Sequence, residues 1–290
     1  MTAVVHRPEE LRAACDSARA AGHRVGLVPT MGALHAGHMS LVRAAREAGA
    51  DWIALTIFVN PLQFAPTDDL DKYPRTLEAD VEACRAEGVD VVFAPADGAM
   101  YGEGFSTAVE VSGVTGPLEG AHREGHFRGV TTVVTKLFNL AGPCVAAFGR
   151  KDYQQWRTLA RMAKDLDMPV TVVGAPIVRE PDGLALSSRN VYLSAEERER
   201  ALGLVTGLRA AWDAFEAGER DARVLLGLAG TLVEMSFDRI DYVALADADD
   251  LGGLPQPIGE RALLAAAAHL GKTRLIDNVV LGEDPRPGGG

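Results

Sequence analysis

Short apolar runs alternate with amphipathic segments along the first two-thirds of the chain. Runs rich in Val, Ile, Leu and Ala are typical of strands that are buried on both faces. They occupy residues 24–29, 52–59, 89–95, 144–148 and 170–178. Segments whose apolar residues follow the helical period lie between them, at 39–48, 76–87, 130–140 and 153–165. Strands that alternate with helices in this way predict an α/β fold with a parallel sheet covered on both faces.

The pattern changes near Arg179. Residues 194–215 are strongly helical, with Ser194 and Glu197 spaced as a capping box, and a second helix covers 222–235. Strand-like segments follow at 240–247 and 273–281. We therefore expect two domains, a larger one over 1–178 and a smaller α+β domain over 179–290. The last nine residues, GEDPRPGGG, are expected to be disordered.

Composition narrows the class of protein. The chain of 290 residues is 47% hydrophobic and 24% charged, and its formal net charge of −11 argues against broad binding of nucleic acid. Cys15, Cys84 and Cys144 lie far apart, which favours a reducing compartment over a disulfide framework. The first residues lack the apolar run of a signal peptide, and no stretch is long enough to span a bilayer. These features predict a cytoplasmic enzyme that is not bound to a membrane.

Two histidines, His35 and His38, lie in the sequence PTMGALHAGH, between the first predicted strand and its helix. A helix N-terminus attracts anions, because its amide hydrogens are unpaired and the helix dipole is positive there. Gly32 and Gly37 would let the backbone approach phosphates closely. A pair of surface histidines is the plainer reading, but the strand–turn–helix setting favours a nucleotide site. A metal site is disfavoured, because the turn holds no third ligand.

Polar residues also follow other predicted strands, at the edge where ligands bind in parallel sheets. Asn60 and Gln63 follow the second strand, where carboxamides can bind hydroxyls and a carboxylate, although Asn-Pro also marks ordinary turns.

Lys151 can offer a point charge to a phosphate, and Gln155 lies one turn further along the same helix. Asp152 could be only an N-cap, and Arg150 could simply point to solvent. Ser187, Ser188 and Arg189 together suit a phosphate, although such a triplet alone is usually a polar loop.

The series PTMGALHAGH, FVNPLQF, YPRT, GHFRGV, KDYQQ and DGLALSSRN resembles the pantothenate synthetase family, from about Val25 to about Asn278. The resemblance implies an enzyme that joins pantoate to β-alanine with ATP and Mg²⁺, through a pantoyl-adenylate. It also implies a Rossmann-like N-terminal domain, a smaller C-terminal domain that closes the active site, and a homodimer.

The resemblance assigns roles to individual residues. His38, His35, Lys151 and Arg189 would be catalytic. Gln63 and Gln155 would bind pantoate, with Gln63 also beside β-alanine, and Asn60, Tyr73 and His126 would lie around the same cavity. The ATP site would comprise Met31, Gly32, Ala33, Leu34, His35, Ala36, Gly37, His38, Gly149, Arg150, Lys151, Asp152, Val178, Leu186, Ser187, Ser188 and Arg189. The metal ligands are left open.

Three departures from the family pattern are local. Arg150 stands where a carboxylate is common, which leaves the phosphate or Mg²⁺ arrangement there open. Leu186 replaces a methionine at similar volume, and Ala36 replaces a residue that is often acidic.

Three other functions share parts of the pattern: a nucleotidyltransferase that stops after transferring a nucleotide, a class I tRNA synthetase, and a nucleotide-binding regulatory module without turnover. The acidic charge and the lack of a basic anticodon domain argue against the synthetase.

Overall fold

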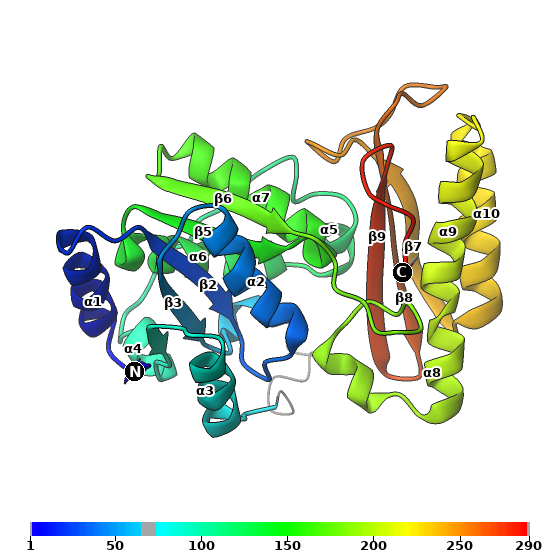
Figure 1. Ribbon diagram of the computed structural model, residues 1–290. Helices are drawn as coiled ribbons and strands as arrows, with labels where there is room; N and C mark the ends of the chain where they lie inside the picture. The colour runs from blue at the N-terminus through cyan, green and yellow to red at the C-terminus, as the bar shows by residue number, and fades with distance from the viewer. Residues whose placement is uncertain (1, 65–73, 289–290) are drawn as a thin grey trace. The chain divides into compact units, whose positions relative to one another are not determined.

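The computed structural model describes residues 2–64 and 74–288 (Figure 1). By the density of contacts this part of the chain divides into two compact units. The first comprises residues 2–64, 74–115, 123–150 and 155–176, and the second comprises 116–122, 151–154 and 177–288. The short segments 116–122 and 151–154 thus belong to the C-terminal unit. The predicted division at residue 178 stays a prediction.

Within the described residues, the first unit contains a six-stranded parallel sheet in the order β1-β4-β3-β2-β5-β6. The α/β prediction is confirmed. The strands are β1 (Ala3–Val5), β2 (Val25–Thr30), β3 (Trp52–Ile57), β4 (Val91–Phe93), β5 (Cys144–Gly149) and β6 (Val170–Ala175). The helical elements are α1 (Pro8–Ala20), α2 (Ala36–Glu47), η1 (Pro61–Gln63), α3 (Leu77–Ala86), α4 (Asp97–Met100), α6 (His126–Ala141) and most of α7 (Tyr153–Asp165).

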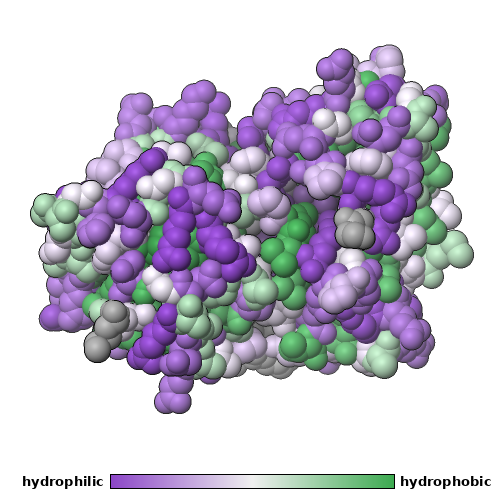
Figure 2. All heavy atoms as spheres, viewed as in Figure 1, coloured by the Kyte–Doolittle hydropathy of each residue, from purple (hydrophilic) through white to green (hydrophobic). Residues whose placement is uncertain are grey.

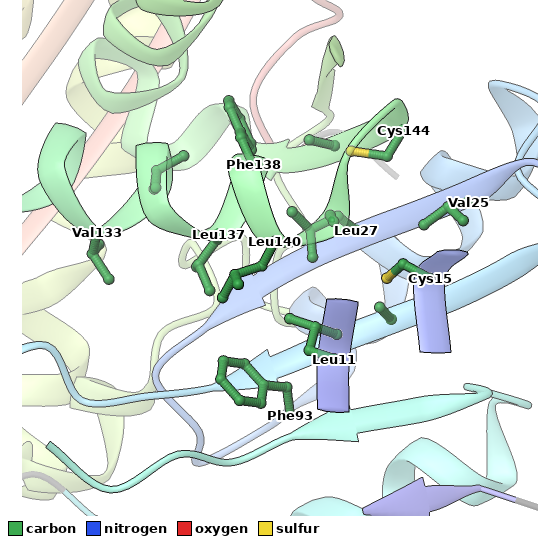
Figure 3. Close-up of a cluster of buried hydrophobic side chains, with 14 of the residues drawn as sticks. Leu11, Cys15, Val25, Leu27, Phe93, Val133, Leu137, Phe138, Leu140 and Cys144 are labelled. Atoms are coloured by element: carbon green, nitrogen blue, oxygen red, sulfur yellow. The ribbon is translucent and has the colours of Figure 1, made fainter. Parts of the chain in front are cut away.

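The helices cover both faces of this sheet. Figure 3 shows one face, where side chains of α1 and α6, such as Leu11 and Phe138, pack over Leu27 of β2 and Phe93 of β4. On the other face α2 and α3 pack over Val28 and other alternate residues of the same strands. Because successive side chains of a strand point to opposite faces, both cores draw on strands β2 to β6. The strands therefore read as continuous apolar runs in the sequence.

The order of the strands reverses between β2 and β5. From β2 the chain proceeds to β3 and β4 on one side, and it later returns to β5 and β6 on the other. The carboxyl ends of these strands are aligned, since Thr30 pairs with Ile57 and Gly149 pairs with Ala175. Ligands of open parallel sheets bind at such a reversal, outside the carboxyl ends. The segments that follow β2 and β5 carry the two histidines and Arg150.

In the second unit three antiparallel strands, in the order β7-β8-β9, pack against helices (Figure 1). The strands are β7 (Arg239–Ala246), β8 (Ala262–Leu270) and β9 (Thr273–Leu281). The helical elements are α5 (Glu119–His122), η3 (Arg150–Asp152), whose first residue belongs to the other unit, η4 (Ser188–Tyr192), α8 (Ala195–Ala201), α9 (Gly203–Glu216) and α10 (Ala222–Ser236). The smaller α+β region is thus confirmed in fold class.

The capping box at Ser194 is present, since Glu197 N–H donates to Ser194 Oγ and Ser194 N–H donates to the Glu197 carboxylate. The single helix predicted over 194–215 is wrong in one respect. It is interrupted at Leu202, after which α9 begins at Gly203. A side chain at Gly203 would collide with Ser236, so this glycine lets α9 approach the end of α10.

The prediction of a disordered tail is wrong for residues 282–288. Arg286 forms an ion pair with Asp213 of α9, at 2.7 Å. Trp212 Nε1 donates to the Asp284 carbonyl, and the Arg209 guanidinium donates to the carbonyls of Pro287 and Gly288. Composition predicted disorder because Gly and Pro bury little surface. The tail is ordered instead by polar side chains of a neighbouring helix that its own composition does not reveal.

The three cysteines are buried as free thiols. Cys15 of α1 and Cys144 of β5 lie in the same hydrophobic core, and Cys84 lies on the inner side of α3. Burial raises the pKa of the Cys15 thiol to about 11 and those of Cys84 and Cys144 to about 12. These side chains therefore behave as small apolar residues of the core.

Hydrophilic residues cover most of the face seen in Figure 2. Within the described part of the chain, no helix is both long and apolar enough to cross a membrane.

Candidate active site

The two histidines of the turn after β2 cap the helix that follows. His35 is the N-cap of α2, and its Nδ1 accepts a hydrogen bond from Gly37 N–H at 3.1 Å. His38 Nδ1 accepts from His35 N–H at 3.2 Å, and the two ring centroids are 4.1 Å apart. Because a backbone N–H can only donate, both Nδ1 atoms are acceptors. A neutral ring in this arrangement carries its proton on Nε2.

A buried carboxylate holds the loop in front of these histidines. Asp80 of α3 is 3% exposed, and it accepts from the N–H groups of Ala33 at 3.0 Å and Leu34 at 2.8 Å. Thr76 Oγ1 also donates to it. Ala33 adopts a left-handed conformation, with φ of 50°, which few residues other than glycine adopt without a compensating contact. Asp80 was not predicted from the sequence, since nothing near it in the chain indicates which loop it contacts.

Gln63, at the end of η1, lies beside this loop. Its Nε2 donates to Met31 Sδ at 3.2 Å, and its Oε1 accepts from Asn60 Nδ2 at 3.0 Å. A thioether is a weak acceptor and an amide nitrogen carries two hydrogens, so this group can also donate to a substrate oxygen. The structure therefore brings Gln63 and the PTMGALHAGH loop together within one unit.

Asn60 supports Gln63 with its whole side chain. It is 1% exposed. Its Nδ2 donates to Gln63 Oε1 and to the Gly129 carbonyl, while its Oδ1 accepts from Leu62 N–H and from Tyr101 Oη. These four bonds use the full capacity of a carboxamide. The geometry thus gives Asn60 a supporting function, and its predicted contact with pantoate stays a prediction.

Helix α6 holds the backbone of Gln63. His126 lies at its first turn and is 9% exposed, with Nε2 at 3.1 Å from the Arg123 guanidinium and Nδ1 at 2.9 Å from the Gln63 carbonyl. Because a guanidinium can only donate, Nε2 accepts, and Nδ1–H donates to Gln63. Gly129 lies one turn later, and a Cβ there would be 2.2 Å from the Leu62 carbonyl oxygen. The GHFRGV motif therefore allows α6 to lie directly against η1.

The segment after β5 is divided between the two units. Gly149 and Arg150 belong to the first unit, and the Arg150 guanidinium lies 5.5 Å from the centre of the Trp156 ring, a cation–π distance. This contact gives the unusual arginine a partner within the protein. Gln155 is partly buried on α7 in the same unit.

Lys151 belongs to the second unit, and its side chain is 18% exposed. Among the described residues its ion-pair partner is the neighbouring Asp152, at 3.9 Å. This separation is near the limit for an ion pair, so the ammonium group keeps most of its charge for a ligand. The carbonyl of Lys151 accepts from Asn278 Nδ2 of β9, at 2.9 Å.

The second unit also holds the serine–arginine segment. Leu186 N–H donates to the Val178 carbonyl, which places these two predicted ATP residues side by side. Ser187 is the N-cap of η4, and its Oγ accepts from Arg189 N–H. The Arg189 side chain is exposed and forms no ion pair with another described residue. Tyr73, the remaining predicted site residue, lies outside the described residues.

Comparison with known proteins finds relatives that match nearly the whole chain. The sequence profile of a family described as pantoate-beta-alanine ligase matches residues 3–280. A protein of Syntrophotalea carbinolica named pantothenate synthetase is 53% identical over 265 residues, which are 91% of this chain and 93% of that protein.

Solved structures of similar fold are also found. The crystal structure of pantothenate synthetase from Thermus thermophilus has a TM-score of 0.89 at 44% identity, covering 96% of this chain and 98% of that one. A structure of pantoate-beta-alanine ligase from Francisella tularensis, complexed with beta-gamma ATP and beta-alanine, has a TM-score of 0.76 at 30% identity, covering 99% and 100%. The chain is therefore a ligase and belongs to the pantoate–β-alanine ligase family.

Proposed function

We propose that the enzyme condenses pantoate with β-alanine in an ATP-dependent reaction that passes through pantoyl-adenylate and releases AMP and pyrophosphate. The observation that carries this proposal is the placement of Gln63, a neutral donor, against the loop of the histidine motif. A site for acid activation must hold a carboxylate next to the α-phosphate of ATP. An uncharged amide can bind an acid without neutralising its nucleophilic carboxylate.

In the first step a pantoate carboxylate oxygen attacks the α-phosphorus of ATP. A new oxygen–phosphorus bond forms, and the bond to the bridging oxygen of pyrophosphate breaks. The protein contributes no nucleophile, so positioning and charge stabilisation supply the rate. His35 and His38 donate from Nε2 to phosphate oxygens, while Lys151 and Arg189 offset the charge that develops on pyrophosphate.

In the second step the uncharged amine of β-alanine attacks the carbonyl carbon of the adenylate. The amide bond forms, AMP leaves with the former carboxylate oxygen, and the amine loses a proton. Gln63 and Gln155 keep the pantoyl group in place through both steps. Exclusion of water matters here, because a mixed anhydride hydrolyses readily.

Mg²⁺ belongs to the same proposal. This ion is commonly held by substrate phosphates and water with few protein ligands, and ATP would supply most of its ligands here. When bound, it would neutralise phosphate charge. Within residues 2–64 and 74–288, no cluster of three or more His, Cys, Asp or Glu side chains could hold a metal ion. A homodimer, predicted from the family resemblance, and a cytoplasmic location, predicted from the composition of the sequence, stay predictions.

One assay tests the proposed reaction. The enzyme is incubated with ATP, Mg²⁺ and pantoate, with and without β-alanine, and pyrophosphate, AMP and pantothenate are measured. We expect stoichiometric pyrophosphate from pantoate and ATP alone, and sustained release of AMP and pantothenate only when β-alanine is added. A nucleotidyltransferase would release pyrophosphate without forming AMP when the amine is added, and a regulatory module would release neither. Either result would overturn the proposal.

The contact between α6 and η1 gives a further prediction. Replacing Gly129 with alanine places a Cβ 2.2 Å from Leu62 O and 2.5 Å from Gln63 N, so η1 must move. We expect the KM for pantoate to rise roughly tenfold or more, since small displacements of binding groups are costly. The melting temperature should also fall. Steady-state kinetics and thermal unfolding measure both effects.

Gly227→Ala is the matched control. Gly227 is also inside a helix, but a Cβ there meets nothing within 4 Å. This variant should be more stable by about 0.5–1 kcal/mol, with an unchanged KM for pantoate. If Gly129→Ala were also to leave that KM unchanged, the position of η1 would not matter for acid binding.

A further inference from the structure

Residues 151–154 are attached to the C-terminal unit by side chains of that unit. Asn278 Nδ2 donates to the Lys151 carbonyl at 2.9 Å, and Tyr153 Oη donates to the Ala248 carbonyl at 2.9 Å. Gln154 Oε1 accepts from Glu119 N–H, also at 2.9 Å. Asn278 is the one of these that acts on Lys151 itself.

Strand β9 presents Asn278 in a fixed place. Asn278 pairs with Ala265 of β8 and is 4% exposed. Leu275 and Val279 of β9 lie in the hydrophobic clusters formed with the helices of the unit. Since side chains alternate along a strand, Asn278 lies on the other face of the sheet. Arg274, four residues earlier on that same face, forms an ion pair with Glu119 at 2.7 Å.

Asp277, the residue before Asn278 in β9, holds the segment that leads to Ser187, Ser188 and Arg189. Asp277 is 2% exposed and accepts two hydrogen bonds from Arg179, at 2.6 and 2.9 Å. Arg179 also donates to the Gly183 carbonyl within the hairpin that leads to Ser187. Two neighbouring residues of β9 thus hold the two segments that carry Lys151 and Arg189. Neither was singled out from the sequence, where Asp277-Asn278 is only part of a strand.

We propose that Asn278 is a positioning residue for Lys151. The hydrogen bond from Asn278 holds the backbone of this lysine, so that the ammonium group of Lys151 meets the phosphates of ATP. The inference rests on the proposed function, because it assigns Lys151 to the nucleotide. The carbonyl of Lys151 lies in η3, a 3₁₀ helix of one turn that ends just before α7 begins. Such a short turn has little regular structure to fix it, so an external donor decides where the lysine side chain starts.

A purely structural role is the alternative, in which Asn278 only satisfies a buried carbonyl. The two roles differ in a double-mutant cycle with Lys151→Ala. A residue that acts through Lys151 has no further effect once the ammonium group is gone. A residue that only stabilises the fold lowers the rate by the same factor in both backgrounds.

The experiment measures adenylation as pyrophosphate release from ATP, Mg²⁺ and pantoate. Single turnovers with enzyme in excess allow slow variants to be followed. We expect Asn278→Ala to lower kcat/KM for ATP by about tenfold to a hundredfold, as misplacement of a catalytic group does. The KM for pantoate should change by less than about twofold, and the same substitution in Lys151→Ala should cost less than about twofold.

Two further variants distinguish a loss of positioning from a general folding defect. Asn278→Asp keeps the shape of the side chain but presents an oxygen to the Lys151 carbonyl, so it should weaken ATP use in the same direction as Asn278→Ala. Val279→Ala, on the other face of β9 and 1% exposed, should lower the melting temperature without changing the KM for ATP.

Equal losses in both backgrounds, or an unchanged kcat/KM for ATP in a folded Asn278 variant, would overturn the positioning role. If neither Asn278 variant folds, the role is structural and the proposal is likewise refuted. Failure of the proposed function is distinguishable from these results, because the unaltered enzyme would then release no pyrophosphate from ATP and pantoate.

Discussion

Lys151→Ala is expected to slow adenylation on the order of a hundredfold or more, by analogy with the loss of one preorganised donor in other enzymes. The ammonium group is largely buried, and its acidic neighbour Asp152 is 3.9 Å away, so most of its charge is available to a phosphate. The charge on pyrophosphate grows as the bond to the α-phosphorus breaks. Lys151 should therefore affect the rate of that step more than the binding of pantoate.

Pyrophosphate release under saturating pantoate measures this effect. Lys164→Ala is the control, since it removes an exposed lysine from the last turn of α7 and should leave the rate within about twofold of the unaltered enzyme. Lys151→Arg keeps the charge but changes its shape, and we expect intermediate activity. Near-normal release by Lys151→Ala would remove this lysine from the mechanism.

Two substitutions at His38 separate its two functions. Its Nδ1 accepts from His35 N–H, and its Nε2 is the donor proposed for ATP. Asparagine places an oxygen near the position of Nδ1, whereas glutamine places an amide near that of Nε2. His38→Asn should thus keep the cap but lose about a hundredfold in adenylation. His38→Gln should keep more of the rate while losing stability through the cap.

Thermal unfolding and pyrophosphate release distinguish the two variants. The exposed His23, changed to alanine, serves as a control in which both quantities should be nearly unchanged. If His38→Asn turned over at a normal rate, the histidine would be only a helix cap. If both variants lost activity in proportion to stability, the Nε2 donor would have no separate role.

The larger unit was predictable because its strands are buried on both faces. Strands of this kind appear in the sequence as continuous apolar runs such as Trp52–Ile57, which is bounded by Gly and Pro. The three-residue strand Ala3–Val5 left no such run and was not predicted. Strand β8 gave a misleading signal, since ALLAAAAHL consists mostly of residues with high helix propensity. Pairing with strands on both sides overrides that propensity, which only tertiary structure reveals.

The site was predictable at the level of motifs rather than contacts. Sequence placed Asn60, Gln63 and His126 near one another, but it could not say which of them would face a ligand. In the structure Asn60 and His126 form hydrogen bonds that support Gln63. Asp80 and Asn278 act on loops 46 and 127 residues away along the chain. Such long-range hydrogen bonds leave no local pattern, so these supporting residues emerged only from the fold.

The buried cysteines have a practical consequence for spectroscopy. Alkylation requires an accessible thiolate, and the pKa of each native thiol, at about 11 or 12, leaves almost none at neutral pH. A cysteine introduced at an exposed position such as Lys164 or Met235 would therefore react with a maleimide dye far faster than the three native ones. Fluorophores could be attached to either compact unit in the otherwise unaltered sequence, and substrate-dependent motion could be followed by energy transfer.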